Sequence, residues 1–324
     1  MDAAIGRLRR ELSVALAILA LAVVLIFAAP GYFALDNLRD LFLANVPVLI
    51  VALGATLVIV SGQIDISVGS VFAICSVAAG VLAKAGLPVW AAALGACAIG
   101  AALGAINGAL VAYARVPSIV ATLATMVALR DGLRWGTQGA WIHDLPRDFQ
   151  WLGFGQAAYP AVSAGMMAAL LIAMAWGLRH LAAGRGVYAV GSNREAARLA
   201  GINVPAVTFW VFTIAGALTG LAALLNAVRF NQIPSNTGIA LEMRVIAAVV
   251  VGGAFITGGR GTVLGTVLGV TLLGAISPAL VFLGVTAYWE RAIQGAIILT
   301  AVAIDAVRIQ RRDRRAVPAA VGAG

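Results

Sequence analysis

The chain has 324 residues, of which 62% are hydrophobic and 11% charged, with a formal net charge of +9 and a mean hydropathy of +1.00. Soluble domains carry about a quarter charged residues, so this composition excludes a soluble domain and indicates an integral membrane protein. The positive charges gather in loops and tails, where they orient a membrane protein, so we expect the lipid bilayer and no nucleic acid as a partner.

Six apolar segments are long enough to cross a bilayer, which takes about 20 residues. They are residues 12–30, 41–61, 88–113, 159–177, 206–228 and 262–284. Four weaker candidates are residues 66–83, 118–129, 239–255 and 292–307. The sequence therefore predicts an all-α membrane protein of about ten helices, forming a single domain over residues 1–324. Since residues 30–32 lack a small-x-small cleavage signature, we expect the first span to be retained.

The loop charges give the orientation. With ten spans and the N-terminus inside, most of the 22 positive residues lie in the cytoplasm, including a basic tail at residues 308–324. The predicted topology satisfies the positive-inside rule with both termini cytoplasmic. The polar segment 178–205, which interrupts the apolar spans, then also lies on the cytoplasmic side.

A short capped helix is predicted inside this polar segment. Ser192 and Glu195 have the spacing of a capping box, Gly201 stands where a left-handed C-terminal cap belongs, and Pro205 prevents continuation. Two turns of helix need a surface to pack on. That surface is either the lipid headgroups or a partner protein. The apolar face of Ala196, Leu199 and Ile202 is small for lipid, so we favour a protein groove.

Glycines four positions apart share one face of a helix and predict close helix packing. Such sets are Gly104/Gly108, Gly216/Gly220 and Gly261/Gly265/Gly269. Residues 61–70 and 252–261 instead interrupt smooth spans with glycine and polar residues. Non-helical backbone at membrane depth survives only where protein or a water-filled cavity covers it, and in transporters such breaks often lie near the pathway.

Asp65 has two interpretations. It caps the following span, with Ser67 and Ser70 helping to satisfy free amides, or it latches a gate against Arg260 or Arg115. We favour the cap, because acidic residues prefer that position.

The predicted outer face has further polar and aromatic residues. Glu242 and Arg244 either contact a substrate or docking partner or form a surface ion pair. The aromatic residues between 130 and 160 either stack on sugars or form an interfacial belt, which we favour.

The chain carries no phosphate-binding Gly-x-x-x-x-Gly-Lys-Ser/Thr motif, because its one lysine, Lys84, lies outside any glycine-rich loop. Two histidines without clustered carboxylates argue against a metal-centred enzyme. The sequence therefore predicts a protein without catalytic residues, cofactor or metal, and any ATPase must be a separate chain.

Four stretches resemble, in order, motifs of the ribose and branched-chain amino acid permease family of ABC importers. They are residues 62–70, 107–126, 195–203 and 246–261, with sequences such as Gly-Gln-Ile-Asp-Ile-Ser-Val-Gly-Ser and Glu-Ala-Ala-Arg-Leu-Ala-Gly-Ile-Asn. Gln63 stands where the family usually has glycine. The motif at 62–70 favours the monosaccharide branch, and residues 288–295 favour rhamnose-type or autoinducer-2-type relatives.

The resemblance implies an inverted-repeat bundle in a bacterial inner membrane that works with a second permease subunit, ABC ATPase subunits and a periplasmic sugar-binding protein. It implies an ATPase-coupling helix comprising Ser192, Arg194, Glu195, Ala196, Ala197, Arg198, Leu199, Gly201 and Ile202. Candidate pathway or gate residues are Asp65, Ser67, Ser70, Thr122, Thr125, Gly252, Gly253 and Arg260. The alternative function is an ion-coupled secondary transporter of a small polar solute, which would need intramembrane ionisable residues.

Overall fold

The computed structural model describes residues 2–286, 289, 292–293, 295–296 and 299, with side chains from residue 11 onward. The predicted span 292–307 lies largely outside these residues, and the tail 308–324 lies wholly outside them. Within the described part no strand is named, and an isolated bridge joins Ile142 to Ile233. The elements are α1 (Asp2–Ala28), the 3-10 helix η1 (Pro30–Phe33), α2 (Leu35–Val60), α3 (Val68–Lys84), α4 (Val89–Ala112), α5 (Ser118–Thr137), the 3-10 helix η2 (Gln150–Gly153), α6 (Tyr159–His180), α7 (Ala182–Ser192), α8 (Arg194–Leu199), α9 (Val204–Ala227), α10 (Leu241–Val251) and α11 (Val263–Phe282).

Among the described residues, six helices are long and apolar enough to cross a membrane: α1 from Glu11, α2, α4, α6, α9 and α11. They are the six clear spans of the prediction. The count of ten is not confirmed. Helix α3 has 17 residues and α10 has 11, which is short of a bilayer's thickness. Helix α5 has 20 residues but carries Arg130, Asp131 and Arg134.

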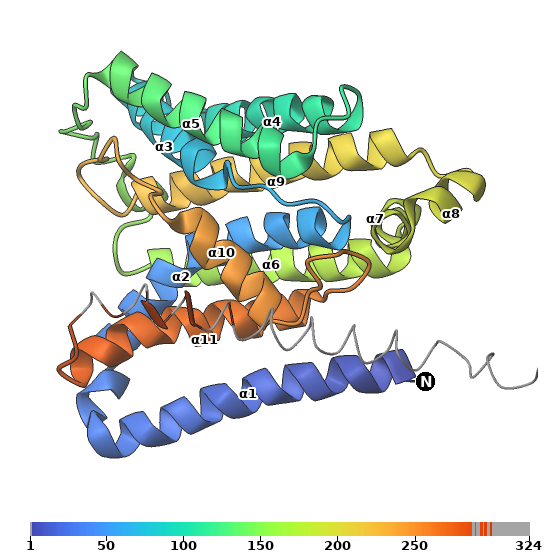
Figure 1. Ribbon diagram of the computed structural model, residues 1–324. Helices are drawn as coiled ribbons and strands as arrows, with labels where there is room; N and C mark the ends of the chain where they lie inside the picture. The colour runs from blue at the N-terminus through green and yellow to red at the C-terminus, as the bar shows by residue number, and fades with distance from the viewer. Residues whose placement is uncertain (1, 287–288, 290–291, 294, 297–298, 300–324) are drawn as a thin grey trace, which may run out of the picture.

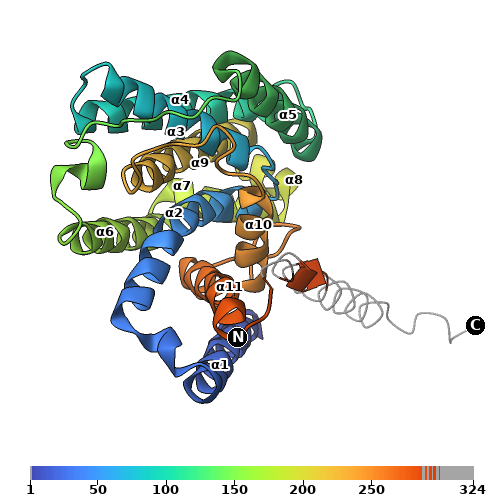
Figure 2. The same ribbon diagram turned by 90° about the vertical axis from the view of Figure 1, so that its left-hand side faces the viewer.

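Helix α2 forms the centre of the bundle, and nearly all of residues 46–60 are buried. Helices α6, α9, α10 and α11 pack around it. Helix α1 lies at the edge, against α11 (Figures 1 and 2). The short helices α7 and α8 lie together at one end of the bundle, here called the α8 end (Figure 1).

Helices α4 and α9 pack with their backbones in contact. A Cβ atom added to Gly100 would overlap the carbonyl oxygen of Gly216, and one added to Gly104 would lie 3.1 Å from the Gly216 Cα. A Cβ on Gly220 would overlap the carbonyl oxygen of Ala96. The predicted small-residue faces are therefore confirmed at this pair, where close approach replaces the hydrophobic drive that lipid does not provide.

Helices α3 and α10 are shorter than a bilayer span because a non-helical segment borders each of them within the bundle. After α2, residues 61–67 run back without helical structure before α3 begins, and α10 is followed by the irregular segment 252–262. The first turns of α3 and α10 lie side by side; α3 runs from there away from the α8 end and α10 runs towards it (Figure 1). A Cβ on either Gly69 or Gly238 would collide with the carbonyl oxygen of the other, so both positions require glycine.

Candidate functional site

The polar segment 178–205 contains two helices where the sequence predicted one. Helix α7 continues to Ser192, and Asn193, with extended backbone at φ −160° and ψ 108°, begins α8. The Asn193 side-chain oxygen accepts a hydrogen bond from the amide of Ala196 at 3.0 Å. The predicted capping box at Ser192 and Glu195 is therefore wrong. Ser192 is the last helical residue of α7, so the N-cap position of α8 falls on Asn193. Asparagine is as good an N-cap as serine.

Glu195 pairs along the helix instead of reaching back to its start. Its two carboxylate oxygens accept hydrogen bonds from Arg198 Nη2 at 2.6 Å and Arg198 Nε at 3.1 Å. The hydrogen bonds from Arg198 lower the pKa of the Glu195 carboxyl. The pair offsets two of the three charges of α8 and leaves Arg194 as its unmatched positive charge.

The end of α8 follows the prediction. Gly201 has a left-handed backbone with φ +81°. Its amide donates to the Arg198 carbonyl, and the Ile202 amide donates to the Ala197 carbonyl, both at 3.0 Å. These two bonds form a Schellman motif, which satisfies carbonyls that would otherwise lack partners.

Helix α8 presents almost all of its side chains to the outside. Ala197 is the one buried residue of the helix, at 4% exposed, whereas Leu199 is 75% exposed. Arg194 and Ala196 are exposed as well. Leu199 thus adds an apolar side chain to a helix surface that is otherwise charged or small.

Behind α8, the end of α7 contacts both broken segments through glycines. A Cβ on Gly191 would overlap the carbonyl oxygen of Val60, the last residue of α2, and lie 2.6 Å from the Gly259 nitrogen. The Gly259 amide donates to that Val60 carbonyl at 2.8 Å. Gly258, with φ +90°, would place a Cβ 2.7 Å from the Gly62 Cα. We call these five residues the glycine junction.

The glycine junction was not predicted as a unit. Residues 61–70 and 252–261 were predicted separately as interruptions of smooth spans, and Gly191 was not among the predicted residues. The only signal was that four of its five residues are glycines, and many glycines of this chain pack closely elsewhere.

Asp65 closes a turn just before α3. Its Oδ1 accepts hydrogen bonds from the amide of Ser67 at 2.8 Å and from the Ser67 hydroxyl at 2.6 Å. Asn107 donates from α4 to the same hydroxyl at 2.8 Å. Because α3 begins at Val68, Asp65 stands two residues before the N-cap position. Asp65 is therefore not the N-cap of α3, a position held by Ser67, but it bonds to that residue. Within the described part of the chain, no ion pair joins Asp65 to Arg260 or Arg115.

Hydroxyl groups of α5 satisfy the broken backbone between α2 and α3. The Ser118 hydroxyl accepts from the Ile64 amide at 3.2 Å, and the Thr122 hydroxyl accepts from the Ile66 amide at 3.1 Å. These bonds show why non-helical backbone is tolerated here. Ser118 was missed by the sequence analysis.

Two more predicted pathway residues donate to backbone carbonyls of α5, the helix to which Thr125 itself belongs. Ser70 donates to the Met126 carbonyl at 2.8 Å, and Thr125 donates to the Thr122 carbonyl at 3.1 Å.

The remaining predicted pathway residues lie on the segment after α10. Gly252 packs against Gly265 so closely that a Cβ would overlap its carbonyl oxygen. Gly253 has φ +101°. The guanidinium of Arg260 lies 5.1 Å from the ring centre of Phe255. Arg260 is exposed.

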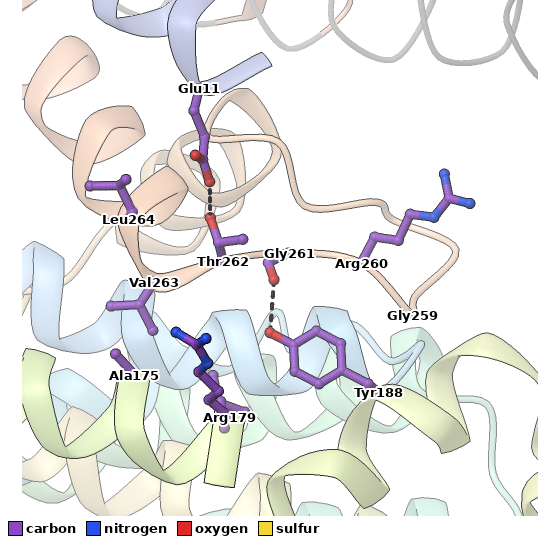
Figure 3. A pocket seen from close by; sticks show the side chains of 11 residues that line it. Glu11, Ala175, Arg179, Tyr188, Gly259, Arg260, Gly261, Thr262, Val263 and Leu264 are labelled. Carbon is purple, nitrogen blue, oxygen red and sulfur yellow. Dashed lines mark hydrogen bonds between the residues drawn. The ribbon is translucent and has the colours of Figure 1, made fainter. Parts of the chain in front are cut away.

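A cavity of about 790 Å³ opens beside this segment (Figure 3). Tyr188 of α7 donates to the Gly261 carbonyl at 2.8 Å, and Thr262 donates to Glu11 of α1 at 2.6 Å. Arg179 points towards the segment, whereas Arg260 points away from Tyr188 (Figure 3). The two hydrogen bonds hold α1 and α7 to the residues that lead into α11.

The prediction that Glu242 lies at the surface is wrong, because its side chain is buried. It is 6% exposed, and its Oε2 lies 3.6 Å from Nη2 of Arg130 on α5. Of the aromatic residues in the 130–160 segment, Trp135 is 86% exposed, while Tyr159 is buried and donates to the Leu225 carbonyl at 2.7 Å. A buried tyrosine of this kind packs the core and belongs to no interfacial belt.

These features define a multi-pass membrane transport subunit: six membrane-length helices, two broken helices and an exposed capped helix at one end. Comparison with known proteins gives the family. The chain belongs to the family described as branched-chain amino acid transport system / permease component, whose model matches residues 37–302. The resemblance inferred from the four motifs is thereby confirmed.

The chain is similar to autoinducer 2 import system permease proteins LsrC. It is 41% identical to the Klebsiella pneumoniae protein over 298 residues, covering 91% of this chain and 86% of the relative. It is 40% identical to the Enterobacter sp. protein over the same shares. For the Yersinia pseudotuberculosis protein the identity is 38%, covering 91% of this chain and 84% of the relative. No solved structure matches the chain.

Proposed function

We propose that the chain is the membrane subunit of an ATP-driven importer for a small sugar-like solute, with autoinducer 2, named for its relatives, as the first solute to test. Because the sequence has no P-loop, ATP hydrolysis belongs to separate ABC ATPase subunits. A second permease subunit, identical or of another kind, completes the pathway, and a periplasmic binding protein delivers the solute.

The observation that carries this proposal is the exposed, doubly capped helix α8, joined through the glycine junction to both broken segments. Helix α8 is the ATPase-docking element, with Leu199 as its apolar anchor and the Glu195–Arg198 pair as its polar rim. Positive charges gather at this end of the bundle: Arg179 lies on α6, Arg185 on α7 and Arg194 on α8. The positive-inside rule therefore supports a cytoplasmic α8 end, with both termini cytoplasmic in a bacterial inner membrane.

The glycine junction gives a route for the movement. When ATP closes the ATPase dimer, a displaced α8 carries α7 with it. Gly191 contacts Val60 and Gly259 without intervening side chains, so displacement reaches both broken segments. ATP acts by binding two states of one bistable assembly with different affinities.

The test is solute uptake into proteoliposomes that contain the permease and its ATPase, with binding protein added. Reversing the charge in Glu195→Lys or breaking α8 in Ala197→Pro is expected to abolish ATP-driven uptake while the permease stays folded. Asp131→Lys is the matched control, since Asp131 is also exposed and lies 4.0 Å from Arg134 at the same helical spacing. Its uptake should be unchanged.

Two results would count against the proposal. Normal uptake by both α8 variants would remove α8 from the mechanism. Uptake that continues without ATP and collapses with an uncoupler would identify an ion-coupled secondary transporter instead.

A further inference from the structure

A second cavity lies where the two broken helices begin. It has a volume of about 330 Å³, at the small end of the roughly 300–1,000 Å³ typical of ligand pockets. Its wall is formed by α2, α3, the end of α9 and the chain from residue 237 into α10. The Gly69–Gly238 contact described above fixes the position of this last wall.

The cavity wall from α2 is stiffened by an unusual contact. Pro47 lies inside α2 and has no amide hydrogen, so the carbonyl of Leu43, four residues earlier, loses its helical partner. Arg229, from the loop after α9, donates to that carbonyl through Nη1 at 2.8 Å. Pro47 itself lines the cavity. The helix break is thus compensated, and the lining backbone is fixed before any ligand arrives.

The lining combines apolar side chains with hydrogen-bonding groups. Phe72, which is 5% exposed, contributes its ring. Asn226 and Thr237 contribute an amide and a hydroxyl, and neither side chain has a hydrogen-bond partner among the described residues. Both also line an adjoining cavity of about 180 Å³. The surface that the lining presents to the cavity is more polar than apolar, which suits a polar solute better than an apolar one.

The charges near the cavity argue against a ligand with a positive group. Its lining contains Arg244 and no carboxylate: Glu242, one residue beyond Leu241 of the wall, is paired with Arg130 instead. A cation or the ammonium group of an amino acid would therefore find no counter-charge. An amide and a hydroxyl that can both donate and accept suit the hydroxyl groups of a sugar-like molecule.

We propose that this cavity is a solute subsite inside the permease for a small polyhydroxylated molecule without a positive charge. Asn226 and Thr237 hydrogen-bond its hydroxyl groups, and Phe72 packs against its carbon skeleton. The proposal rests on the proposed function, of which it names the substrate chemistry and the place in the bundle.

A protection assay tests the subsite without ATP or any partner. Cys75 and Cys97 are replaced by alanine, and Thr237→Cys places a single thiol in the lining of the purified permease. The rate of labelling by a small neutral maleimide is measured with autoinducer 2, D-ribose or L-leucine present. Asn236→Cys is the matched control, because Asn236 is exposed one residue away and lines neither cavity.

At a solute concentration about ten times its dissociation constant, roughly nine-tenths of the cavities are filled, so labelling should slow about tenfold. We expect this at Thr237→Cys with autoinducer 2 or D-ribose, no effect of L-leucine, and no protection of Asn236→Cys. Equal labelling with and without both polyhydroxylated probes, or equal protection by L-leucine, would overturn the proposal. Protection without ATP-driven uptake would instead keep the subsite and refute the ATP-driven function.

Discussion

Adding one methyl group at the glycine junction, in Gly191→Ala, should uncouple α8 from the rest of the bundle. The new Cβ would overlap the Val60 carbonyl oxygen and lie 2.6 Å from the Gly259 nitrogen, both of them backbone atoms that cannot rotate away. Overpacking of this kind costs about 1–3 kcal/mol. Separating the two segments also breaks the 2.8 Å hydrogen bond from Gly259 to Val60, worth about 0.5–1.5 kcal/mol.

Gly186→Ala in the same helix is the matched control. There the nearest atoms to a Cβ are the Val207 and Ile202 methyl groups at 3.7 and 3.9 Å, which is ordinary contact. Alanine also improves helix propensity by about 1 kcal/mol over glycine. The same gain in helix propensity applies at position 191 and cancels in the comparison. The overpacking and the lost hydrogen bond remain, so the free energies of unfolding of the two variants should differ by about 1.5–4.5 kcal/mol.

The assay compares thermal unfolding of the purified permease with ATP-driven uptake in proteoliposomes. Gly186→Ala should be at least as stable as the wild type and fully active. Gly191→Ala should unfold at lower temperature and transport less solute per ATP hydrolysed. If both variants matched the wild type in stability and in solute transported per ATP, the glycine junction would not be the tight contact that the geometry indicates.

Three further results are expected. Asn193→Ala should destabilise α8 by about 1 kcal/mol because it removes the N-cap, whereas Ser192→Ala should leave it unchanged; amide hydrogen exchange of α8 measures both. The lowered pKa of Glu195 means that its pairing with Arg198 favours the helix above the ordinary carboxyl pKa and is lost as pH falls through the lower, folded value. After correction for the intrinsic exchange rate, which itself falls steeply with pH, protection of the α8 amides should thus stay constant at neutral pH and fall once the pH drops below the ordinary carboxyl pKa. Arg198→Gln, with weaker protection already at neutral pH, should lose most of this pH dependence. Thr122→Val should cost about 1–3 kcal/mol by leaving the half-buried Ile66 amide of the broken segment without its acceptor, and unchanged unfolding would show that the amide finds another partner.

Local sequence signals predicted the local structure well. The six clear spans follow from runs of about 20 apolar residues, and the left-handed cap at Gly201 follows from the conformational freedom of glycine. The N-cap was misplaced by one residue. Ser192 and Asn193 are both good caps, and the choice between them depends on how far α7 continues, which is decided by its packing on α2.

Tertiary relations were harder to predict. Glu242 was expected at a surface because charge usually indicates exposure, but its burial depends on Arg130 lying opposite on α5, more than a hundred residues away in sequence. The broken segments were recognised from their glycines and polar residues. That they meet at Gly191, and that hydroxyls of α5 satisfy one of them, depends on side-by-side packing that no local pattern encodes.

Photo-crosslinking from α8 tests the central claim, that this helix docks on the ATPase, most directly. Leu199, 75% exposed on α8, and Trp135, 86% exposed on α5, are replaced in turn by a photoreactive amino acid in membranes that contain the assembled transporter. We predict an adduct between position 199 and the ATPase subunit that changes in yield when ATP is added, and no such adduct from position 135. Adducts of position 199 with lipid alone, in membranes that support ATP-driven uptake, would contradict the account.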